Sequence, residues 1–136
     1  MRSLGCFSWP RLVTLLLVLY WIAILTATHL PEVPSVALAR QDKMAHYVAY
    51  AGLAFLLSWA WTSRGRDFLP RGMLFALAVA TLYGAVDELT QIPVPGRFGD
   101  WYDWLADMIG ALTGTVVFAG AAKMYRRVCH AHSVVR

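Results

Sequence analysis

Four long apolar segments alternate with shorter polar segments along the chain. A bilayer core about 30 Å thick needs roughly 20 apolar residues per helix, because a helix rises about 1.5 Å per residue. Each segment meets or nearly meets that length, and together they predict transmembrane helices over residues 12–30, 44–63, 72–91 and 104–122. We therefore expect an all-α polytopic membrane protein, a bundle of four transmembrane helices that forms one domain over residues 1–136.

The composition favours the same class. Hydrophobic residues make up 59% of the chain and charged residues 15%, and the mean hydropathy is +0.53. Soluble domains have about 45–50% apolar and about 25% charged residues. The net charge of +4 does not indicate a nucleic-acid partner, because the basic residues lie between apolar segments and not in one soluble patch. Membrane lipids are the partners that this composition predicts.

The basic residues are distributed unequally between the two ends of the predicted bundle. Lysine and arginine are enriched in cytoplasmic loops of membrane proteins. This bias predicts four crossings of the cytoplasmic membrane, with both termini in the cytoplasm. The nine basic residues on the predicted inner side are Arg2, Arg11, Arg64, Arg66, Arg71, Lys123, Arg126, Arg127 and Arg136. The three on the outer side are Arg40, Lys43 and Arg97.

Ionisable residues of three helices are predicted to meet near the outer end. Counting the helical rise from the inner basic residues places His46, Asp87 and Asp107 at one depth, roughly 24–27 Å away. Charged groups are unfavourable against lipid, so the helix faces that carry these residues are expected to point inward. Together they are expected to form a water-accessible pocket that opens outward. Each residue alone is better explained as an interface marker or an ion pair that fixes helix register, and only their convergence from three helices favours a site. The pairs that share a helix face are Asp42 with His46, Glu88 with Gln91, and Asp103 with Asp107.

The third loop and the fourth helix carry two further signals. Pro93, Pro95, Gly96 and Gly99 exclude a regular helix in this loop, which also holds Arg97. The planar guanidinium of Arg97 suits an anion clamp for a lipid head group, or alternatively a salt bridge that pins the loop to nearby acids.

Small residues one helical turn apart allow another helix to approach closely. The GxxxG pair Gly110 and Gly114 on the fourth helix has this spacing. It predicts close packing, either within the chain or between two copies in a homo-oligomer.

The ordered set of polar motifs resembles the VanZ-like family, small integral membrane proteins related to the teicoplanin-resistance protein VanZ. The motifs are Asp42-Lys43-x-x-His46, Asp87-Glu88-x-x-Gln91 and Pro95-Gly96-Arg97, followed by Asp103, Asp107, Gly110 and Gly114. The chain departs from the family at Asp107, where asparagine is common, and this adds a negative charge. The resemblance implies a bacterial cell-envelope protein of the cytoplasmic (inner) membrane. It also implies a link to resistance against a lipoglycopeptide antibiotic.

The leading functional hypothesis is a binding protein. Its outward-facing pocket would bind a lipid-linked head group or modulate susceptibility to the lipoglycopeptide teicoplanin. No cofactor is expected, and no metal site of established ligand spacing is present in the sequence. The candidate ligand-binding residues are Asp42, Lys43, His46, Glu88, Gln91, Arg97, Asp103 and Asp107.

Two alternatives remain open. The first is a membrane-embedded enzyme acting on a lipid or polyprenyl phosphate at the outer interface, with His46 as general acid or base and Glu88 or Asp103 orienting it. A divalent metal held by Asp42, His46, Glu88 and Asp103 belongs to this alternative. The sequence disfavours the enzyme because it contains no nucleophile motif. The second alternative is a structural helix-bundle scaffold whose charged pairs hold the helices in register.

Overall fold

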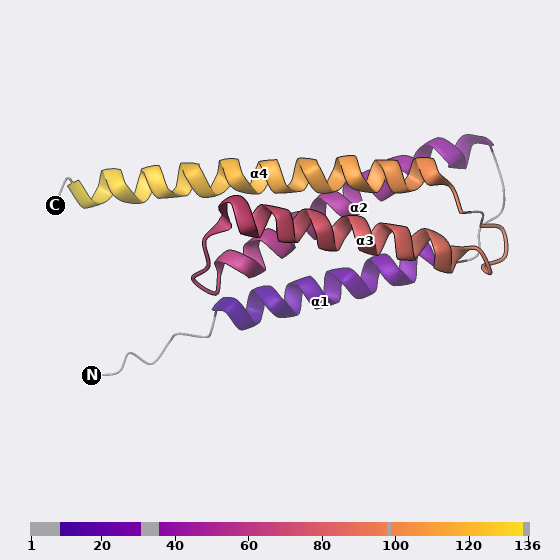
Figure 1. Cartoon of the computed structure of the whole chain (residues 1–136), viewed down its shortest axis with the longest axis horizontal. Helices are drawn as coiled ribbons and strands as arrows, with labels where there is room; N and C mark the ends of the chain where they lie inside the picture. The colour runs from indigo at the N-terminus through magenta and orange to yellow at the C-terminus, as the bar shows by residue number, and fades with distance from the viewer. Residues whose placement is uncertain (1–8, 31–35, 98, 135–136) are drawn as a thin grey trace.

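The computed structural model describes residues 9–30, 36–97 and 99–134, and four α-helices account for most of them (Figure 1). The helices are α1 (Trp9–Thr28), α2 (Val36–Thr62), α3 (Met73–Gln91) and α4 (Trp101–Val134). A π-helical turn, Phe68–Gly72, leads into α3. The predicted all-α class is confirmed.

α1 begins three residues before its predicted start, and α2 and α4 extend much further beyond their predicted bounds. α2 begins at Val36 although the sequence predicts a start near residue 44, and α4 continues to Val134, past residue 122. The apolar length of a segment measures the part that fits the bilayer core, whereas the helix itself continues while its backbone hydrogen bonds are satisfied. The polar ends of α2 and α4 are therefore helical too, which places their charged side chains at regular helical positions.

Apolar side chains are exposed on α1, α3 and α4. Leu19 of α1 is 54% exposed, Leu82 of α3 is 68% exposed and Val116 of α4 is 55% exposed. Extensive apolar surface of this kind is unfavourable in water and suits contact with lipid. Within the described residues, the spans Trp9–Thr28, Phe68–Gln91 and Trp101–Arg127 are long and apolar enough to cross a bilayer. These observations support the predicted membrane class.

α2 is not among these three spans, although the sequence predicts a crossing over residues 44–63. The helix packs against α1, α3 and α4 and supplies much of the core, including the buried residues Tyr50, Leu53 and Ala54. A helix surrounded by other helices faces protein on several sides and therefore needs less apolar surface than a lipid-facing helix.

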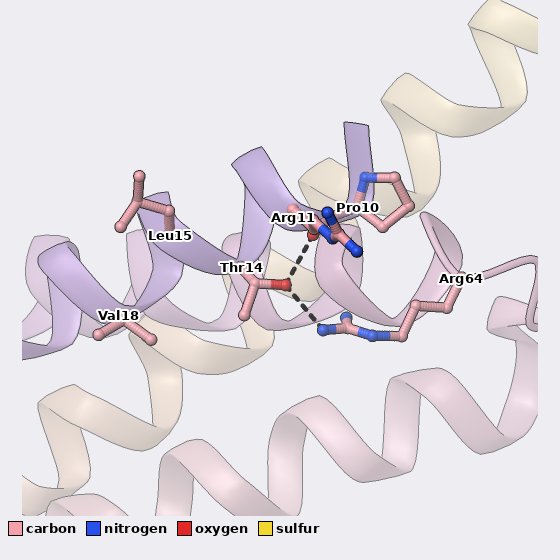
Figure 2. Close-up of a pocket in the computed structure, with 6 residues that line it drawn as sticks. All are labelled: Pro10, Arg11, Thr14, Leu15, Val18 and Arg64. Carbon is pink, nitrogen blue, oxygen red and sulfur yellow. Dashed lines mark hydrogen bonds between the residues drawn. The ribbon is translucent and has the colours of Figure 1, made fainter. Parts of the chain in front are cut away.

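α1 begins and α4 ends at the same end of the bundle, where α2 also connects to α3 (Figure 1). Arg64 joins two elements there, because its Nη2 donates a hydrogen bond of 2.7 Å to Thr14 Oγ1 of α1 (Figure 2). A pocket of about 540 Å³ at this position is lined by Pro10, Arg11, Thr14, Leu15, Val18 and Arg64. Two residues counted in the predicted charge distribution, Arg2 and Arg136, lie outside the described residues.

The GxxxG pair packs within the chain. A Cβ atom at Gly110 would collide with the backbone carbonyl of Tyr47, and one at Gly114 would collide with that of Ala51. Both partners belong to α2, so α4 approaches α2 at backbone distance along this face. Of the two roles that the sequence left open, the structure shows the intrachain one. A homo-oligomer would need a different surface, because α2 already occupies this one.

Replacing Gly114 by alanine is expected to destabilise the bundle. The added methyl group meets the α2 backbone, which cannot move without separating the helices, and overpacking of this kind costs about 1–3 kcal/mol. A Cβ atom added at Gly120 on the same helix would have no neighbouring atom within 4 Å, so Gly120→Ala is the matched control. We expect Gly120→Ala to be neutral or to stabilise by up to about 1 kcal/mol through helix propensity. Thermal unfolding in detergent measures both, and equal effects would contradict the packing.

Candidate functional site

Polar side chains of all four helices meet at the end of the bundle where α3 connects to α4. His46 of α2 lies at the centre and is 3% exposed. Its Nδ1 donates a hydrogen bond of 3.0 Å to Asp107 Oδ1 of α4 and lies 3.9 Å from Glu88 Oε1 of α3. Its Nε2 lies 4.0 Å from Asp42 Oδ1, one turn earlier on α2. The predicted convergence of three helices on one polar cluster is present in the structure.

Local sequence explains how α4 reaches this centre. Gly84 of α3 faces Asp107, and a Cβ at Gly84 would lie 2.8 Å from Asp107 Oδ2, so only glycine leaves room for the carboxylate. Trp104 donates a hydrogen bond of 3.0 Å from Nε1 to the Thr81 carbonyl and thereby fixes α4 on α3. The spacing of four residues between Asp103 and Asp107 then places both carboxylates on the same side of α4.

Asp87 links α3 to α1. Its Oδ1 accepts a hydrogen bond of 2.9 Å from the Thr28 hydroxyl, and its Oδ2 accepts one of 3.0 Å from Gln91 Nε2. His29 Nδ1 lies 3.8 Å from Oδ1. The sequence placed Asp87 at the correct depth but did not include it among the binding residues, and it missed Thr28. The signal available was that Thr28 and His29 are polar residues at the end of an apolar segment.

The α3–α4 loop closes over the cluster through two basic residues. Lys43 Nζ donates hydrogen bonds of 2.6 Å to Asp100 Oδ2 and 2.7 Å to Asp103 Oδ1. Arg97 Nη1 lies 3.4 Å from both Asp42 Oδ1 and Gln91 Oε1. Both basic residues are therefore engaged with acidic or amide groups, as in the salt-bridge interpretation of Arg97.

Asp100 was absent from the predicted set, yet it connects three elements. Its Oδ2 accepts the hydrogen bond from Lys43, and its backbone N–H donates one of 2.8 Å to Glu88 Oε2. Its Oδ1 also accepts a hydrogen bond of 2.9 Å from the Tyr102 N–H at the start of α4, as a helix-capping residue does. An aspartate four residues before the predicted start of the fourth helix, at the end of the loop rich in proline and glycine, was the signal that could have identified it.

The charges around Lys43 and Asp100 shift both pKa values. Partial burial opposes ionisation of each group, but the hydrogen bonds and the opposite charges outweigh it. The pKa of Lys43 is raised above its usual value by Asp100 and Asp103. The pKa of Asp100 is lowered by Lys43 and by the Tyr102 N–H. Both side chains remain partly exposed, at 40% and 36%, so the pair stabilises the loop only modestly.

This pair predicts a defined pH dependence for Asp100→Asn, which removes the charge and keeps a capping side chain. A lowered folded-state pKa gives stability that is present above the unfolded pKa of about 3.9 and is lost as the pH falls through the folded pKa. The raised pKa of Lys43 keeps its positive charge up to strongly alkaline pH. We expect the variant to melt slightly below wild type between pH 5 and pH 9, and the difference to shrink progressively as the pH falls below about 4. A difference that grows on acidification would contradict this account.

The surroundings of His46 match the enzyme alternative in part, since Glu88 Oε1 lies 3.9 Å from its Nδ1. The sequence favours Glu88 or Asp103 as the group that orients the imidazole. Asp103 instead binds Lys43, and Asp107 makes the hydrogen bond to His46. Any general acid or base chemistry at His46 would therefore depend on Asp107.

Carboxylates outnumber cations in the cluster. His46 Nε2, Glu88 Oε1 and Asp107 Oδ2 are buried and have no hydrogen-bond partner within the described residues, and the same is true of the hydroxyls of Tyr50 and Tyr83. The six carboxylates are Asp42, Asp87, Glu88, Asp100, Asp103 and Asp107, and the lysine and arginine among them are Lys43 and Arg97. The cluster therefore suits a ligand that brings positive charge or hydrogen-bond donors.

Comparison with known proteins gives one match. The family model described as VanZ/LLP1 matches residues 9–123, which include α1, α2, α3, most of α4 and every residue of the polar cluster. No curated protein and no solved structure matches the chain. The family match covers most of the sequence and agrees with the resemblance carried by the polar motifs. The chain belongs to the VanZ/LLP1 family.

Proposed function

We propose that this chain is an integral protein of the bacterial cell envelope that binds the head group of a lipid-linked envelope component at its polar cluster. The observation that carries the proposal is the cluster itself. Three helices, α2, α3 and α4, bring buried ionisable side chains together at one end of a bundle with extensive exposed apolar surface, where a lipid head group would lie. The proposed contacts are Asp42, Lys43, His46, Glu88, Gln91, Arg97, Asp103 and Asp107.

The same proposal includes four crossings of the cytoplasmic membrane with both termini in the cytoplasm. Support comes from the basic residues Arg11, Arg64 and Arg66 at the end where α1 begins and from the excess of acids at the other end. The central position of α2 supports its crossing, since α2 runs between helices that are themselves apolar enough to span a bilayer. The polar cluster would then face the outer side.

The excess of carboxylates favours a particular class of head group. Lys43 and Arg97 are already engaged with Asp100, Asp103 and Asp42, so a bare phosphate would have to displace these contacts. A head group with amine, hydroxyl or amide donors can instead bind the carboxylates directly. Lipoglycopeptide antibiotics and lipid-linked envelope precursors both carry such groups, and a link to teicoplanin susceptibility would follow from competition for them.

Thermal unfolding in the presence of defined lipids tests this function. A ligand that binds only the folded state raises the melting temperature. We expect phosphatidylethanolamine, which carries an amine, to stabilise the wild type more than phosphatidylglycerol does, and to lose this effect in Glu88→Gln. Asp67 is an exposed acid at the opposite end, so Asp67→Asn is the control and should respond like wild type. Equal responses of all three proteins to both lipids would reject the cluster as the binding site.

A further inference from the structure

Three residues at the centre of the cluster have the chemistry and the spacing of a metal site. His46, Glu88 and Asp107 each offer one ligand atom, and these atoms lie within 4.8 Å of one another. His46 Nδ1 is 3.0 Å from Asp107 Oδ1 and 3.9 Å from Glu88 Oε1. Ligand atoms about 2.0–2.2 Å from a metal ion lie roughly 3–3.5 Å from each other in tetrahedral or octahedral geometry. Small side-chain movements would bring the three atoms to these distances.

The hydrogen bonding of these residues is an independent observation that points to a ligand. Glu88 is 8% exposed, and its Oε1 faces His46 without a hydrogen-bond partner within the described residues. Asp107 is fully buried, and its Oδ2 is also unpartnered among those residues. Buried carboxylate oxygens without partners are unfavourable, most of all in a membrane protein. A cation bound between Glu88 Oε1 and His46 Nδ1 would remove that cost at Glu88.

The surrounding residues would orient the ligands as they do in known types of metal site. Glu88 Oε2 accepts the Asp100 backbone N–H at 2.8 Å, which holds the carboxylate with Oε1 directed inward. His46 Nε2 lies 4.0 Å from Asp42 Oδ1, so a metal at Nδ1 would leave Nε2–H facing a carboxylate. Metal-bound histidines commonly donate their other ring N–H to such a group.

A second set of three residues, Asp42, His46 and Asp103, also lies within ligand distance. It is less suitable because its carboxylates are already used. Asp42 contacts Arg97 at 3.4 Å, and Asp103 contacts Lys43 at 2.7 Å. The set that includes Glu88 retains oxygens without a partner in the described part of the chain and is entirely buried.

We propose that His46, Glu88 and Asp107 bind one divalent transition-metal ion of the zinc or manganese type. One imidazole nitrogen with two carboxylate oxygens suits these ions, whereas magnesium and calcium prefer oxygen ligands alone. Binding requires Nδ1 without a proton and Nε2 with one. From the imidazolium the Nδ1 proton is released to solvent, and from the neutral Nδ1–H tautomer it is transferred to Nε2, which lies 4.0 Å from Asp42 Oδ1. The site requires no lipid, so it holds or fails separately from the proposed function.

Measuring the metal content of the purified protein tests the proposed metal site directly. Purified protein in detergent is stripped with a chelator, dialysed against Zn²⁺, Mn²⁺ or Mg²⁺ in separate samples, and analysed by elemental mass spectrometry. We expect about one Zn²⁺ or Mn²⁺ per chain in wild type and in the control Asp67→Asn, and at least a tenfold loss in Glu88→Gln and Asp107→Asn. Circular dichroism confirms that the variants are folded. Wild type that retains neither ion, retains Mg²⁺ equally well, or loses nothing in the folded variants would overturn the proposal.

A measurement on wild type alone keeps the test decisive if the variants fail to fold. Electron spin-echo spectroscopy of the Mn²⁺-loaded protein detects nitrogen atoms bound to the metal. We expect the modulation of one directly bound imidazole nitrogen, from His46. Bound Mn²⁺ without nitrogen modulation would place the ion on carboxylates elsewhere and overturn the assignment. Lipid stabilisation that persists in the chelator-stripped protein would show that the proposed function stands without the metal.

Discussion

Replacing Asp87 by alanine is expected to lower the free energy of unfolding by about 2–6 kcal/mol, because two buried hydrogen-bond donors lose their acceptor. The side chain is 1% exposed and accepts hydrogen bonds from Thr28 and Gln91. Both donors are buried and would lose their acceptor, and each unsatisfied buried donor costs about 1–3 kcal/mol. Because Asp87 joins α3 to α1, the loss also weakens the attachment of the first helix.

Unfolding in mixed detergent micelles, followed by circular dichroism, measures this effect. Thr28→Val removes one hydrogen bond at nearly constant volume, so we expect a smaller loss of about 1 kcal/mol. Asp67→Ala changes an exposed acid at the opposite end of the bundle and should stay within about 0.5 kcal/mol of wild type. An Asp87→Ala variant as stable as Asp67→Ala would mean that the polar cluster does not hold α1 to α3.

Replacing Arg97 by alanine is expected to cost about 2–4 kcal/mol, because a hydrogen bond to a charged group contributes about 1.5–3 kcal/mol and the Asp42 partner is 24% exposed. The Arg97 side chain is 7% exposed, and it connects the α3–α4 loop to Asp42 of α2 and, through Nε, to the Leu30 carbonyl at 3.3 Å. Removing it frees the loop from both contacts and leaves Asp42 without its cation. An anion clamp without a structural role would instead lose little stability in the absence of ligand.

A double-mutant cycle with Asp42→Ala separates these two interpretations. A salt bridge predicts that the double variant is about as stable as the less stable single variant, with a coupling energy above about 1 kcal/mol. Arg66, an exposed arginine that stacks on Trp61 at the other end, provides the control. Arg66→Ala should change stability by less than about 1 kcal/mol. Additive effects of Arg97→Ala and Asp42→Ala would contradict the salt bridge.

The helices were predictable because membrane insertion imposes a strong sequence pattern. Apolar length located all four, and helical rise placed His46, Asp87 and Asp107 at one level before any contact was known. The helix ends at Val36 and Val134 were not predictable. Hydropathy identifies only the apolar stretch that fits the bilayer core, and it does not show how far the helix continues outside that core.

Contacts between distant segments were the part that the sequence could not specify. Thr28 and Asp100 join the cluster through loop geometry and helix rotation, which local spacing does not encode. The two roles of Arg97 could not be separated without knowing which helices face each other. The same holds for intrachain and interchain packing of Gly114. A metal set assembled from three helices has no sequence spacing of its own, so the absence of a zinc motif was uninformative.

Native mass spectrometry of gently extracted protein tests the central claim, that the polar cluster is a ligand-binding site, most directly. Wild type and the folded Glu88→Gln variant are compared in the same detergent. We predict a discrete additional mass on wild type, corresponding to a lipid, a metal ion or both, and its absence from the variant. Bare protein in both samples, or the same bound mass in both, would contradict the claim and favour a cluster whose charged pairs only hold the four helices in register.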